Sequence, residues 1–362
     1  MRILIGGGGT GGHIYPALAL ARYAQAKDGS TEIIFVGSAA GLESKIVPSA
    51  GFTLVTIPAR GFQRSFKQLG AMLKDFFGGL KRSLKLLNEY RPNVVLGTGG
   101  YVAAPLVLSA VLKRIPVVIH EQNALPGMAN RYLAPFVSKV CLSFAETAKR
   151  MPPFSKGFFT GNPRASEVSA LSREEGCRHF GLDPGQKNIL IYGGSQGALK
   201  LNQVITAYLK EELLPEGVNL IYVTGDIYHE AVIAELGDLP KQVRLYSYLD
   251  KMPEALAAAD LTVTRSGATT LAELTALGVP ALLVPSPNVV NNHQYYNARL
   301  LSDAGAAILI EEKYFTHYRL QEDINWLFSN PEQLREMSGK SKAMGMPDAA
   351  EKLYRCLKEV AS

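Results

Sequence analysis

The sequence predicts an α/β protein built from two Rossmann-like, doubly wound domains that face one cleft. The first observation is a glycine-rich turn that occurs twice, at 6–13 and at 193–198, each time between a short apolar strand and a helical pattern. Such a turn presents backbone N–H groups at a helix N-terminus to a phosphate. The second is the alternation of strand-like and helical runs, which is typical of parallel sheets. The third is the length, because 362 residues suit two domains.

Six strands are expected in each half of the chain. The first half places them at Arg2–Ile5, Glu32–Val36, Thr53–Ile57, Val94–Gly97, Val117–His120 and Lys139–Leu142. The second half places them at Asn188–Tyr192, Asn219–Val223, Val243–Tyr246, Leu261–Thr264, Ala281–Val284 and Ala307–Ile310. Two sets of six match what two Rossmann-like domains need.

The join between the halves lies at 159–186, where two turns rich in glycine and proline flank a polar helical stretch. We place the boundary at Pro163, so that 1–163 forms the N-terminal domain and 164–347 the C-terminal domain. The sequence lets the final helix, 348–362, pack on either domain, and we expect it to return to the N-terminal one.

The composition is that of an ordinary folded protein, with 47% hydrophobic and 19% charged residues. No apolar run approaches the ~20 residues of a membrane span, and Met1-Arg2 leads directly into a strand without a secretory signal. We therefore expect the chain to stay in the cytoplasm. Cys141, Cys177 and Cys356 have neither metal-ligand spacing nor a disulfide framework, which fits a reducing compartment.

The net charge of +6 is concentrated between Arg60 and Arg114, where ten Lys and Arg residues are opposed only by Asp75 and Glu89. That segment alone carries +8, and a local basic patch indicates an anionic partner. Read as a helix, the segment is amphipathic, and Gly78-Gly79 is expected to break it in two.

The plain interpretation of this segment is a helix that packs its apolar face on its own sheet. It is also a candidate for contact with an anionic membrane. The candidate contacts are Phe66, Leu69, Phe76 and Phe77 on the apolar arc and Lys74, Lys81 and Arg82 on the opposite arc. Nucleic acid is disfavoured, because the segment lacks the interleaved aromatic and basic residues of a stacking platform.

The first glycine turn ends in His13, a candidate general base. His13 lies where the first helix begins, and the positive end of the helix dipole favours a neutral imidazole. The surrounding glycines leave the ring open to a ligand, whereas the plain alternative is a capping or packing histidine. A dinucleotide is disfavoured, because the second strand ends at 35–38 without the acidic residue that holds a ribose.

Two other strand ends in the first half carry candidate residues. His120-Glu121-Gln122-Asn123 ends one strand in four polar residues, and Gly97–Tyr101 offers close backbone approach after another. The alternatives are a polar turn and a tight left-handed turn.

In the second half, the stretch 264–270 runs from a strand into a helix N-terminus that suits a diphosphate. Glu273, further along that helix, can accept hydrogen bonds from ribose hydroxyls or else lies on a solvated face. The amide-rich stretch 291–297 can bind sugar hydroxyls. No Asp-x-Asp and no His/Cys/carboxylate cluster offers metal spacing, so no metal is expected, and helix N-termini and cations must neutralise the diphosphate.

Taken together, these stretches resemble the MurG family, the N-acetylglucosaminyltransferases of peptidoglycan synthesis. The matching motifs keep their order along nearly the whole chain: 8–13, 97–101, 120–130, 161–164, 193–198, 266–273 and 293–298. The resemblance implies the GT-B fold and inverting transfer of N-acetylglucosamine from UDP-N-acetylglucosamine to the C4 hydroxyl of the muramyl sugar of lipid I, forming lipid II. It implies a peripheral protein at the cytoplasmic face of the cell membrane, with other cell-wall synthesis proteins as partners and no cofactor.

By the same resemblance, the C-terminal domain holds the donor and the N-terminal domain holds lipid I. The implied donor contacts are Arg164, Ser195, Gln196, Leu249, Ser266, Gly267, Glu273, His293 and Gln294. Some relatives have Gln-Gln where this chain has His293-Gln294. The implied acceptor contacts are Thr10, Gly11, Gly12, Gly99, Gly100, Tyr101, Asn123 and Asn130.

His13 is the expected base, with Glu121 as its competitor. Two other functions stay open. One is a non-catalytic nucleotide-sugar sensor or membrane scaffold on the same fold, and the other is a transferase that acts on a different lipid.

Overall fold

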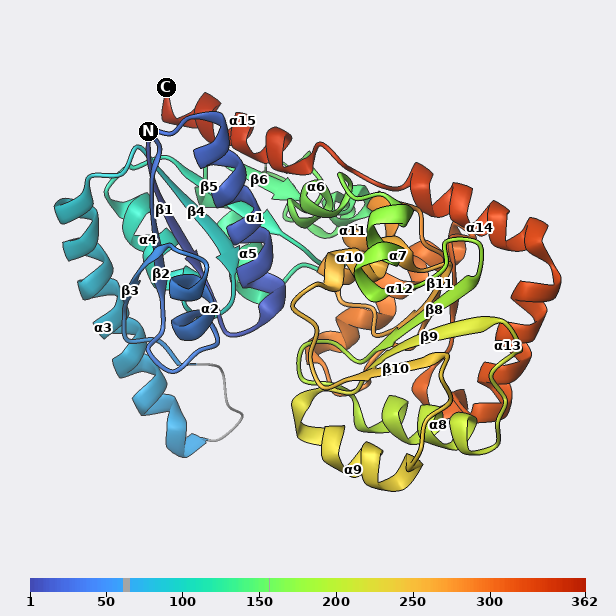
Figure 1. Cartoon of the computed structure of the whole chain (residues 1–362). Helices are drawn as coiled ribbons and strands as arrows, with labels where there is room; N and C mark the ends of the chain where they lie inside the picture. Colours follow the sequence, from blue (N-terminus) through green and yellow to red (C-terminus); the bar gives the residue numbers. More distant parts are fainter. Residues whose placement is uncertain (61–65, 156) are drawn as a thin grey trace. The chain divides into compact units, whose positions relative to one another are not determined.

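The computed structural model describes residues 1–60, 66–155 and 157–362, and the side chains of 66–69 also lie outside the described part. The chain divides into two compact units. The N-terminal unit comprises Met1–Ser166 and Met346–Ser362, and the C-terminal unit comprises Glu167–Gly345. Each unit is a parallel sheet covered by helices, as Figure 1 shows.

The N-terminal unit contains a seven-stranded sheet in the order β3-β2-β1-β4-β5-β6-β7, with every neighbouring pair parallel. Its strands are β1 Arg2–Gly7, β2 Glu32–Gly37, β3 Thr53–Thr56, β4 Val94–Gly99, β5 Val117–Glu121, β6 Lys139–Leu142 and β7 Gly157–Phe159. Its helices are α1 Gly11–Lys27, α2 Glu43–Ser49, α3 Phe66–Tyr90, α4 Ala103–Leu112, α5 Met128–Leu133 and α15 Ala349–Ala361, with short 3₁₀ helices η1 Ala134–Phe136 and η2 Ala145–Arg150.

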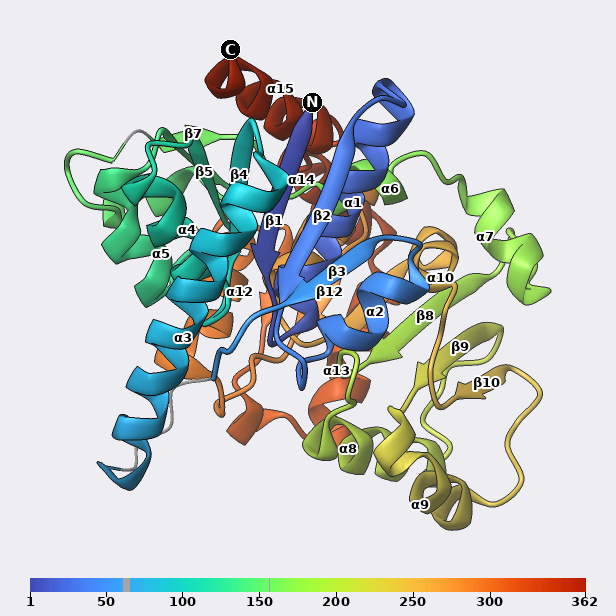
Figure 2. The ribbon, with the colours of Figure 1, turned by 90° about the vertical axis from the view of Figure 1, so that its left-hand side faces the viewer.

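The two faces of this sheet have separate cores. Ile3 and Ile5 of β1 point to one face, where α1 and α15 pack, and Leu4 points to the other, where α3 and α4 pack (Figure 2). The alternation follows from the period of two along a strand. The apolar side of α15 supplies Leu353, Tyr354, Cys356 and Leu357 to the first core. The C-terminal helix is therefore a part of the N-terminal unit.

The C-terminal unit contains a six-stranded parallel sheet in the order β10-β9-β8-β11-β12-β13. Its strands are β8 Lys187–Tyr192, β9 Val218–Val223, β10 Val243–Tyr246, β11 Leu261–Thr264, β12 Ala281–Leu283 and β13 Ala307–Leu309. Its helices are α7 Arg173–Phe180, α8 Leu199–Lys210, α9 Asp226–Leu236, α10 Met252–Ala258, α11 Ala268–Leu277, α12 His293–Asp303, α13 His317–Ser329 and α14 Pro331–Ala343. The short 3₁₀ helices are η3 Val290–Asn292 and η4 Glu312–Tyr314, and α6, Arg164–Val168, spans the boundary between the units.

In both units the chain order of the first six strands is 3-2-1-4-5-6, the order of a Rossmann fold. The order reverses between β1 and β4 in one sheet and between β8 and β11 in the other. Ligands of open parallel sheets bind where the strand order reverses, beyond the carboxyl ends of the strands. The two glycine-rich turns follow β1 and β8, so each lies at such a position.

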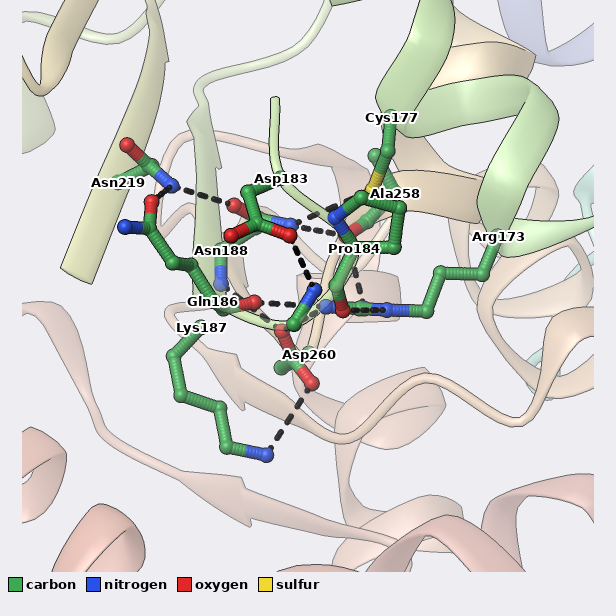
Figure 3. Close-up of polar contacts among 11 residues, drawn as sticks. Arg173, Cys177, Asp183, Pro184, Gln186, Lys187, Asn188, Asn219, Ala258 and Asp260 are labelled. Atoms are coloured by element: carbon green, nitrogen blue, oxygen red, sulfur yellow. Dashed lines mark hydrogen bonds and ion pairs between the residues drawn. The ribbon is translucent and has the colours of Figure 1, made fainter. Parts of the chain in front are cut away.

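At the amino ends of β8 and β11, on the side of the second sheet away from the carboxyl ends, lies a polar network centred on Asp260 (Figure 3). Its carboxylate accepts hydrogen bonds from Arg173 at 2.9 Å and from the Asn188 backbone N–H at 2.8 Å, and it lies 3.4 Å from Lys187. Arg173 also donates to the carbonyls of Pro184, Gln186 and Ala258. This network fixes α7 to the amino end of β8 and leaves the carboxyl edge to the site.

Two expectations about elements of the N-terminal unit need correction. A seventh strand, β7, extends the sheet; its three residues are exposed, so the sequence offers no buried apolar run that would mark it. The expected break at Gly78-Gly79 does not occur, since α3 is continuous from Phe66 to Tyr90. A Cβ on Gly79 would lie 2.4 Å from the Pro58 carbonyl oxygen, so this glycine allows α3 to approach the chain after β3.

Candidate functional site

The site of the N-terminal unit is built on two adjacent strand ends. β1 and β4 pair Gly6 with Gly97 and Gly7 with Gly99, so the two glycine-rich turns lie side by side. Gly99 and Gly100 have φ of +102° and +79°, which favours glycine at both positions. A Cβ on Gly100 would also lie 2.4 Å from the Gly8 carbonyl oxygen, so the close contact between the turns requires glycine there.

His13 lies in the first turn of α1, above these two turns. Its Nδ1 is 3.1 Å from the Gly8 carbonyl oxygen and 3.3 Å from the Thr10 hydroxyl. A carbonyl only accepts, so in the neutral ring Nδ1 carries the proton and donates it to Gly8, while Nε2 is the basic nitrogen. The backbone oxygen of His13 accepts a hydrogen bond from Thr98 at 2.9 Å, which ties α1 to β4.

Glu121, at the end of β5, is buried and fully engaged within the protein. One carboxylate oxygen accepts from the Asn123 backbone N–H at 2.9 Å, and the other from the Gly127 N–H at 2.9 Å and the Asn130 side chain at 2.8 Å. The Asn123 side-chain amide is a fourth donor at 3.4 Å, and a carboxylate with these donors is poorly placed to take a proton from a substrate hydroxyl. The hydrogen bond from Asn130 also fixes the position of that side chain relative to Glu121.

His120 and Gln122, which the sequence placed with Glu121 among polar ligand-facing residues, are instead buried beneath the site. His120 Nε2 is 3.0 Å from the Gly161 carbonyl oxygen, and Nδ1 is 3.1 Å from Gln122 Nε2. Gln122 also donates to the Thr98 carbonyl at 2.8 Å. Burial, with a smaller contribution from the nearby His13, lowers the pKa of His120 to about 4 although the hydrogen bond to Gly161 raises it, so the ring is neutral. These residues form the floor of the site.

The remaining acceptor candidates surround His13. Gly11 and Gly12 begin α1, where the backbone N–H groups of a first helical turn have no partner within the helix. Thr10 is exposed, and the ring of Tyr101 lies against Gly9. A Cβ on Gly99 would lie 3.0 Å from His13 Nε2 and 3.6 Å from Asn130, so these three residues are neighbours. Asn123 is half-buried and its carbonyl accepts from Thr147.

In the C-terminal unit, the residues after β11 and those of α12 form one hydrogen-bonded group. Ser266 is buried and donates to the Gln294 carbonyl at 2.8 Å, and Asn297 donates to the Ser266 carbonyl at 3.2 Å. The Gln294 side-chain oxygen accepts from the Ser286 backbone N–H at 2.9 Å. Gly267 is the N-cap of α11. The start of α11 and the start of α12 are therefore held together.

The other donor candidates of this unit lie in loops or in the helices α11 and α12. Ser195 and Gln196 are exposed in the turn after β8, and Leu249 is buried beside the half-exposed Tyr248. Glu273 is only 6% exposed, which excludes the solvated-face alternative. His293 Nδ1 is 2.9 Å from the Val290 carbonyl oxygen, so its Nδ1–H is engaged with its own loop.

Arg164 belongs to the N-terminal unit, unlike the other donor candidates. Its guanidinium lies over the ring of Tyr15, 5.6 Å from the ring centroid. Tyr15 is in α1, two residues after His13, so Arg164 lies beside α1.

The membrane candidates are only in part described. Phe66 and Leu69 lie outside the described side chains. On α3, Phe77 is 62% exposed, Lys74 and Lys81 are exposed, and Phe76 and Arg82 are half-buried. Leu73, which is 47% exposed, adds to this surface. Among the described residues, no helix is both long enough and apolar enough to cross a membrane.

The described residues contain no group of three or more His, Cys, Asp or Glu side chains that could hold a metal ion. The sequence reading missed one residue near the site, Glu43, whose carboxylate is fully buried and bonds to Gly9. Its only signal in the sequence is a carboxylate shortly after Gly37 and Gly41, beyond a strand whose end carries no acidic residue.

Comparison with known proteins gives a consistent result over the whole chain. The glycosyltransferase family 28 N-terminal domain matches residues 3–142, and the C-terminal domain of the same family matches 188–353. The UDP-N-acetylglucosamine--N-acetylmuramyl-(pentapeptide) pyrophosphoryl-undecaprenol N-acetylglucosamine transferase of Halalkalibacterium halodurans is 45% identical, over 100% of both chains. The enzyme of the same name from Bacillus subtilis is 42% identical over 99% of each.

Solved structures agree with the sequence relatives. The crystal structure of Acinetobacter baumannii MurG has a TM-score of 0.79 and 29% identity, with 99% of each chain covered. The UDP-GlcNAc 2-epimerase of Neisseria meningitidis, bound to UDP-GlcNAc, has a TM-score of 0.69 at 16% identity, and this likeness concerns the fold alone.

Proposed function

The chain belongs to glycosyltransferase family 28, with a GT-B-like fold, and from this premise we propose the reaction that it catalyses. It transfers N-acetylglucosamine from UDP-N-acetylglucosamine to the C4 hydroxyl of the muramyl sugar of undecaprenyl-pyrophosphoryl-N-acetylmuramyl-pentapeptide, lipid I, and so forms lipid II in peptidoglycan synthesis. The observation that carries this conclusion is the full-length identity of 45% and 42% with two transferases named for that reaction.

The two units bind different substrates in the proposed reaction. The N-terminal unit binds lipid I, because the backbone of Gly11, which is half-buried, and of Gly12, which is exposed, begins α1 and suits a pyrophosphate. The C-terminal unit binds the donor, with the diphosphate near Ser195 and Gln196, the ribose at Glu273 and the sugar at Gln294. Arg164, His293 and Leu249 are further candidate donor contacts. No metal is needed, since helix N-termini and backbone N–H groups stabilise the charge of the leaving UDP.

The mechanism is a single displacement that inverts the anomeric carbon. The C4 oxygen of the acceptor forms a bond to that carbon, the bond from the carbon to the UDP oxygen breaks, and the hydroxyl proton passes to His13 Nε2. The hydrogen bond from Nδ1 to Gly8 makes Nε2 the accepting nitrogen. Asn130, held by Glu121, lies beside this ring and can orient the acceptor sugar.

The protein acts at the cytoplasmic face of the membrane as a peripheral protein. On α3, Leu73 and Phe77 offer exposed apolar side chains close to the cations Lys74 and Lys81. Apolar contact and attraction to anionic lipids add in such an arrangement. This surface keeps the enzyme near a lipid-linked acceptor, and other cell-wall synthesis proteins are candidate partners.

The test is release of UDP from UDP-N-acetylglucosamine, with and without a soluble lipid I analogue. Acceptor-dependent release supports the transferase, and UDP-N-acetylgalactosamine, run in parallel, tests donor selection. His13→Ala is expected to lower kcat by ~10²–10⁴, the usual contribution of a general base. The matched control is His179→Ala, an exposed histidine of α7 in the other unit. Binding of UDP without any turnover would instead favour the sensor, and turnover only with another lipid would favour a different acceptor.

A further inference from the structure

Glu43, the first residue of α2, is a carboxylate with no exposure to solvent. A buried charge is costly unless hydrogen bonds satisfy it. One oxygen accepts from the Ser38 backbone N–H at 2.9 Å and the Ser38 hydroxyl at 2.7 Å, and the other accepts from the Gly9 N–H at 2.9 Å. Burial raises the pKa of Glu43, but these hydrogen bonds outweigh it and leave the pKa below its ordinary value. The side chain is therefore ionised.

Three glycines surround this carboxylate at distances that exclude a side chain. A Cβ would lie 2.4 Å from a Glu43 carboxylate oxygen at Gly8, 2.2 Å from one at Gly41, and 2.6 Å from Glu43 Cγ at Gly37. None of the three has a positive φ, so the contact with Glu43, and not the backbone conformation, accounts for glycine at these positions. Part of the glycine-rich turn thus serves to enclose a fixed negative charge.

The bond to Gly9 connects Glu43 to His13 through a single peptide group. The N–H of Gly9 and the carbonyl of Gly8 belong to the same planar unit and point in opposite directions. The N–H donates to Glu43, and the carbonyl accepts from His13 Nδ1. A charged acceptor on one side polarises the peptide, and hydrogen bonds in such a series strengthen one another.

We propose that Glu43 is a positioning residue for His13, which it holds in the Nδ1–H tautomer through the Gly8–Gly9 peptide. This proposal rests on the function proposed above, in which His13 Nε2 accepts the acceptor proton. Glu43 itself touches no substrate, because it is enclosed by the protein. It sets the orientation of the Gly8 carbonyl, and that carbonyl sets which ring nitrogen carries the proton.

The decisive variant is Glu43→Gln, which keeps the size of the side chain and removes its charge. We expect kcat to fall 10–100-fold, the usual effect of losing a group that orients a first ligand or base, with the KM for UDP-N-acetylglucosamine within twofold of the unchanged enzyme. The second readout is the ¹⁵N chemical shifts of the His13 ring, assigned by comparison with His13→Asn. They should report Nδ1–H in the unchanged protein and a mixture of tautomers in the variant.

Ser38→Ala is the matched control, since it removes a hydrogen bond from the other carboxylate oxygen and keeps both the charge and the Gly9 bond. We expect it to retain the Nδ1–H tautomer and to change kcat less than threefold. If Glu43→Gln does not fold, Glu43→Asp replaces it, because the shorter side chain keeps the charge but withdraws it from Gly9.

Unchanged kcat and an unchanged tautomer in the Glu43 variant would overturn the proposal. So would an equal loss of kcat in Ser38→Ala, which would show that any disturbance of this region has the same effect. The nitrogen shifts need no substrate. If UDP release fails with every acceptor while the tautomer still depends on Glu43, the proposed function is wrong and the link to His13 stands.

Discussion

Replacing Glu121 by Gln distinguishes two possible roles of this residue, a general base and a residue that orients Asn130. In the structure, four donors converge on this buried carboxylate: the N–H groups of Asn123 and Gly127, the side-chain amide of Asn130 and, at 3.4 Å, the side-chain amide of Asn123. A glutamine has an oxygen at one position only. If that oxygen keeps the Gly127 and Asn130 bonds, the new NH₂ group faces the Asn123 N–H, and two donors oppose each other.

The cost follows from the strengths of these bonds. A hydrogen bond to a charged group contributes about 1.5–3 kcal/mol and a neutral one about 0.5–1.5 kcal/mol. The variant loses one charged bond and weakens two others to neutral strength, which amounts to about 4 kcal/mol. Because the neutral amide is easier to bury than a carboxylate, part of this loss is offset, and we expect a net loss of about 2–3 kcal/mol in the N-terminal unit.

The assay is urea unfolding followed by two signals. Far-ultraviolet circular dichroism reports both units, whereas the fluorescence of Trp326, the sole tryptophan, reports the C-terminal unit alone. Glu121→Gln should lower the urea midpoint of the N-terminal unit seen by circular dichroism and leave the midpoint seen by fluorescence unchanged. A loss below 1 kcal/mol, together with a kcat lowered a thousandfold, would refute this reasoning and make Glu121 the base.

Four further predictions follow from the described contacts. The pKa of His120 is about 4 in the folded protein against 6.5 ordinarily, so the unfolded chain binds the proton first as pH falls. His120 therefore contributes roughly 3 kcal/mol to the free energy of unfolding above pH 6.5, and this contribution is lost as the pH falls towards 4. His120→Gln should flatten that part of the pH dependence of unfolding, and an unchanged slope would contradict this. Gly79→Ala should destabilise by about 1–3 kcal/mol through its contact with Pro58, whereas Gly70→Ala in the same helix, with no atom within 4 Å, should not. Asp260→Asn should lower the free energy of unfolding measured by Trp326 fluorescence in urea by about 2 kcal/mol. The KM for UDP-N-acetylglucosamine should not change, and a raised KM would place this network in the site. Phe77→Ser should weaken binding to anionic vesicles at least fivefold in a sedimentation assay, and equal weakening in the control Ile227→Ser, in the other unit, would argue against a specific surface on α3.

The sequence was sufficient to predict the two-domain fold, which the comparisons confirm. Each of the twelve expected strands is present within two residues of its expected ends, because a short apolar run followed by glycine or a polar residue marks a buried parallel strand. The prediction failed where tertiary contact overrides local preference. Two glycines cost a helix about 1 kcal/mol each, yet α3 continues through Gly78-Gly79 because the backbone of Gly79 packs against Pro58.

In the candidate site too, features that depend on neighbouring residues were predictable, and contacts between distant segments were not. Strand ends located the turns around His13, Gly99 and Glu121, since the rule about carboxyl edges needs only the order of elements. The hydrogen-bond partners of those residues could not be predicted from the sequence. Glu43 bonds to a residue 34 positions away, and nothing in either segment alone shows that they meet. The direction of His120, towards the interior, likewise depends on Gly161, 41 positions later.

The contribution of α15 to the N-terminal core has a consequence for biosynthesis. Residues 1–166 leave the ribosome first, but Leu353, Tyr354 and Leu357, which complete that core, are made only after the entire C-terminal unit. At 5–20 residues per second, translation of the intervening segment takes on the order of 10–40 s. Throughout that interval the nascent N-terminal sheet exposes an apolar surface beside α1. A chaperone that covers this apolar surface would act during that interval, before α15 is made.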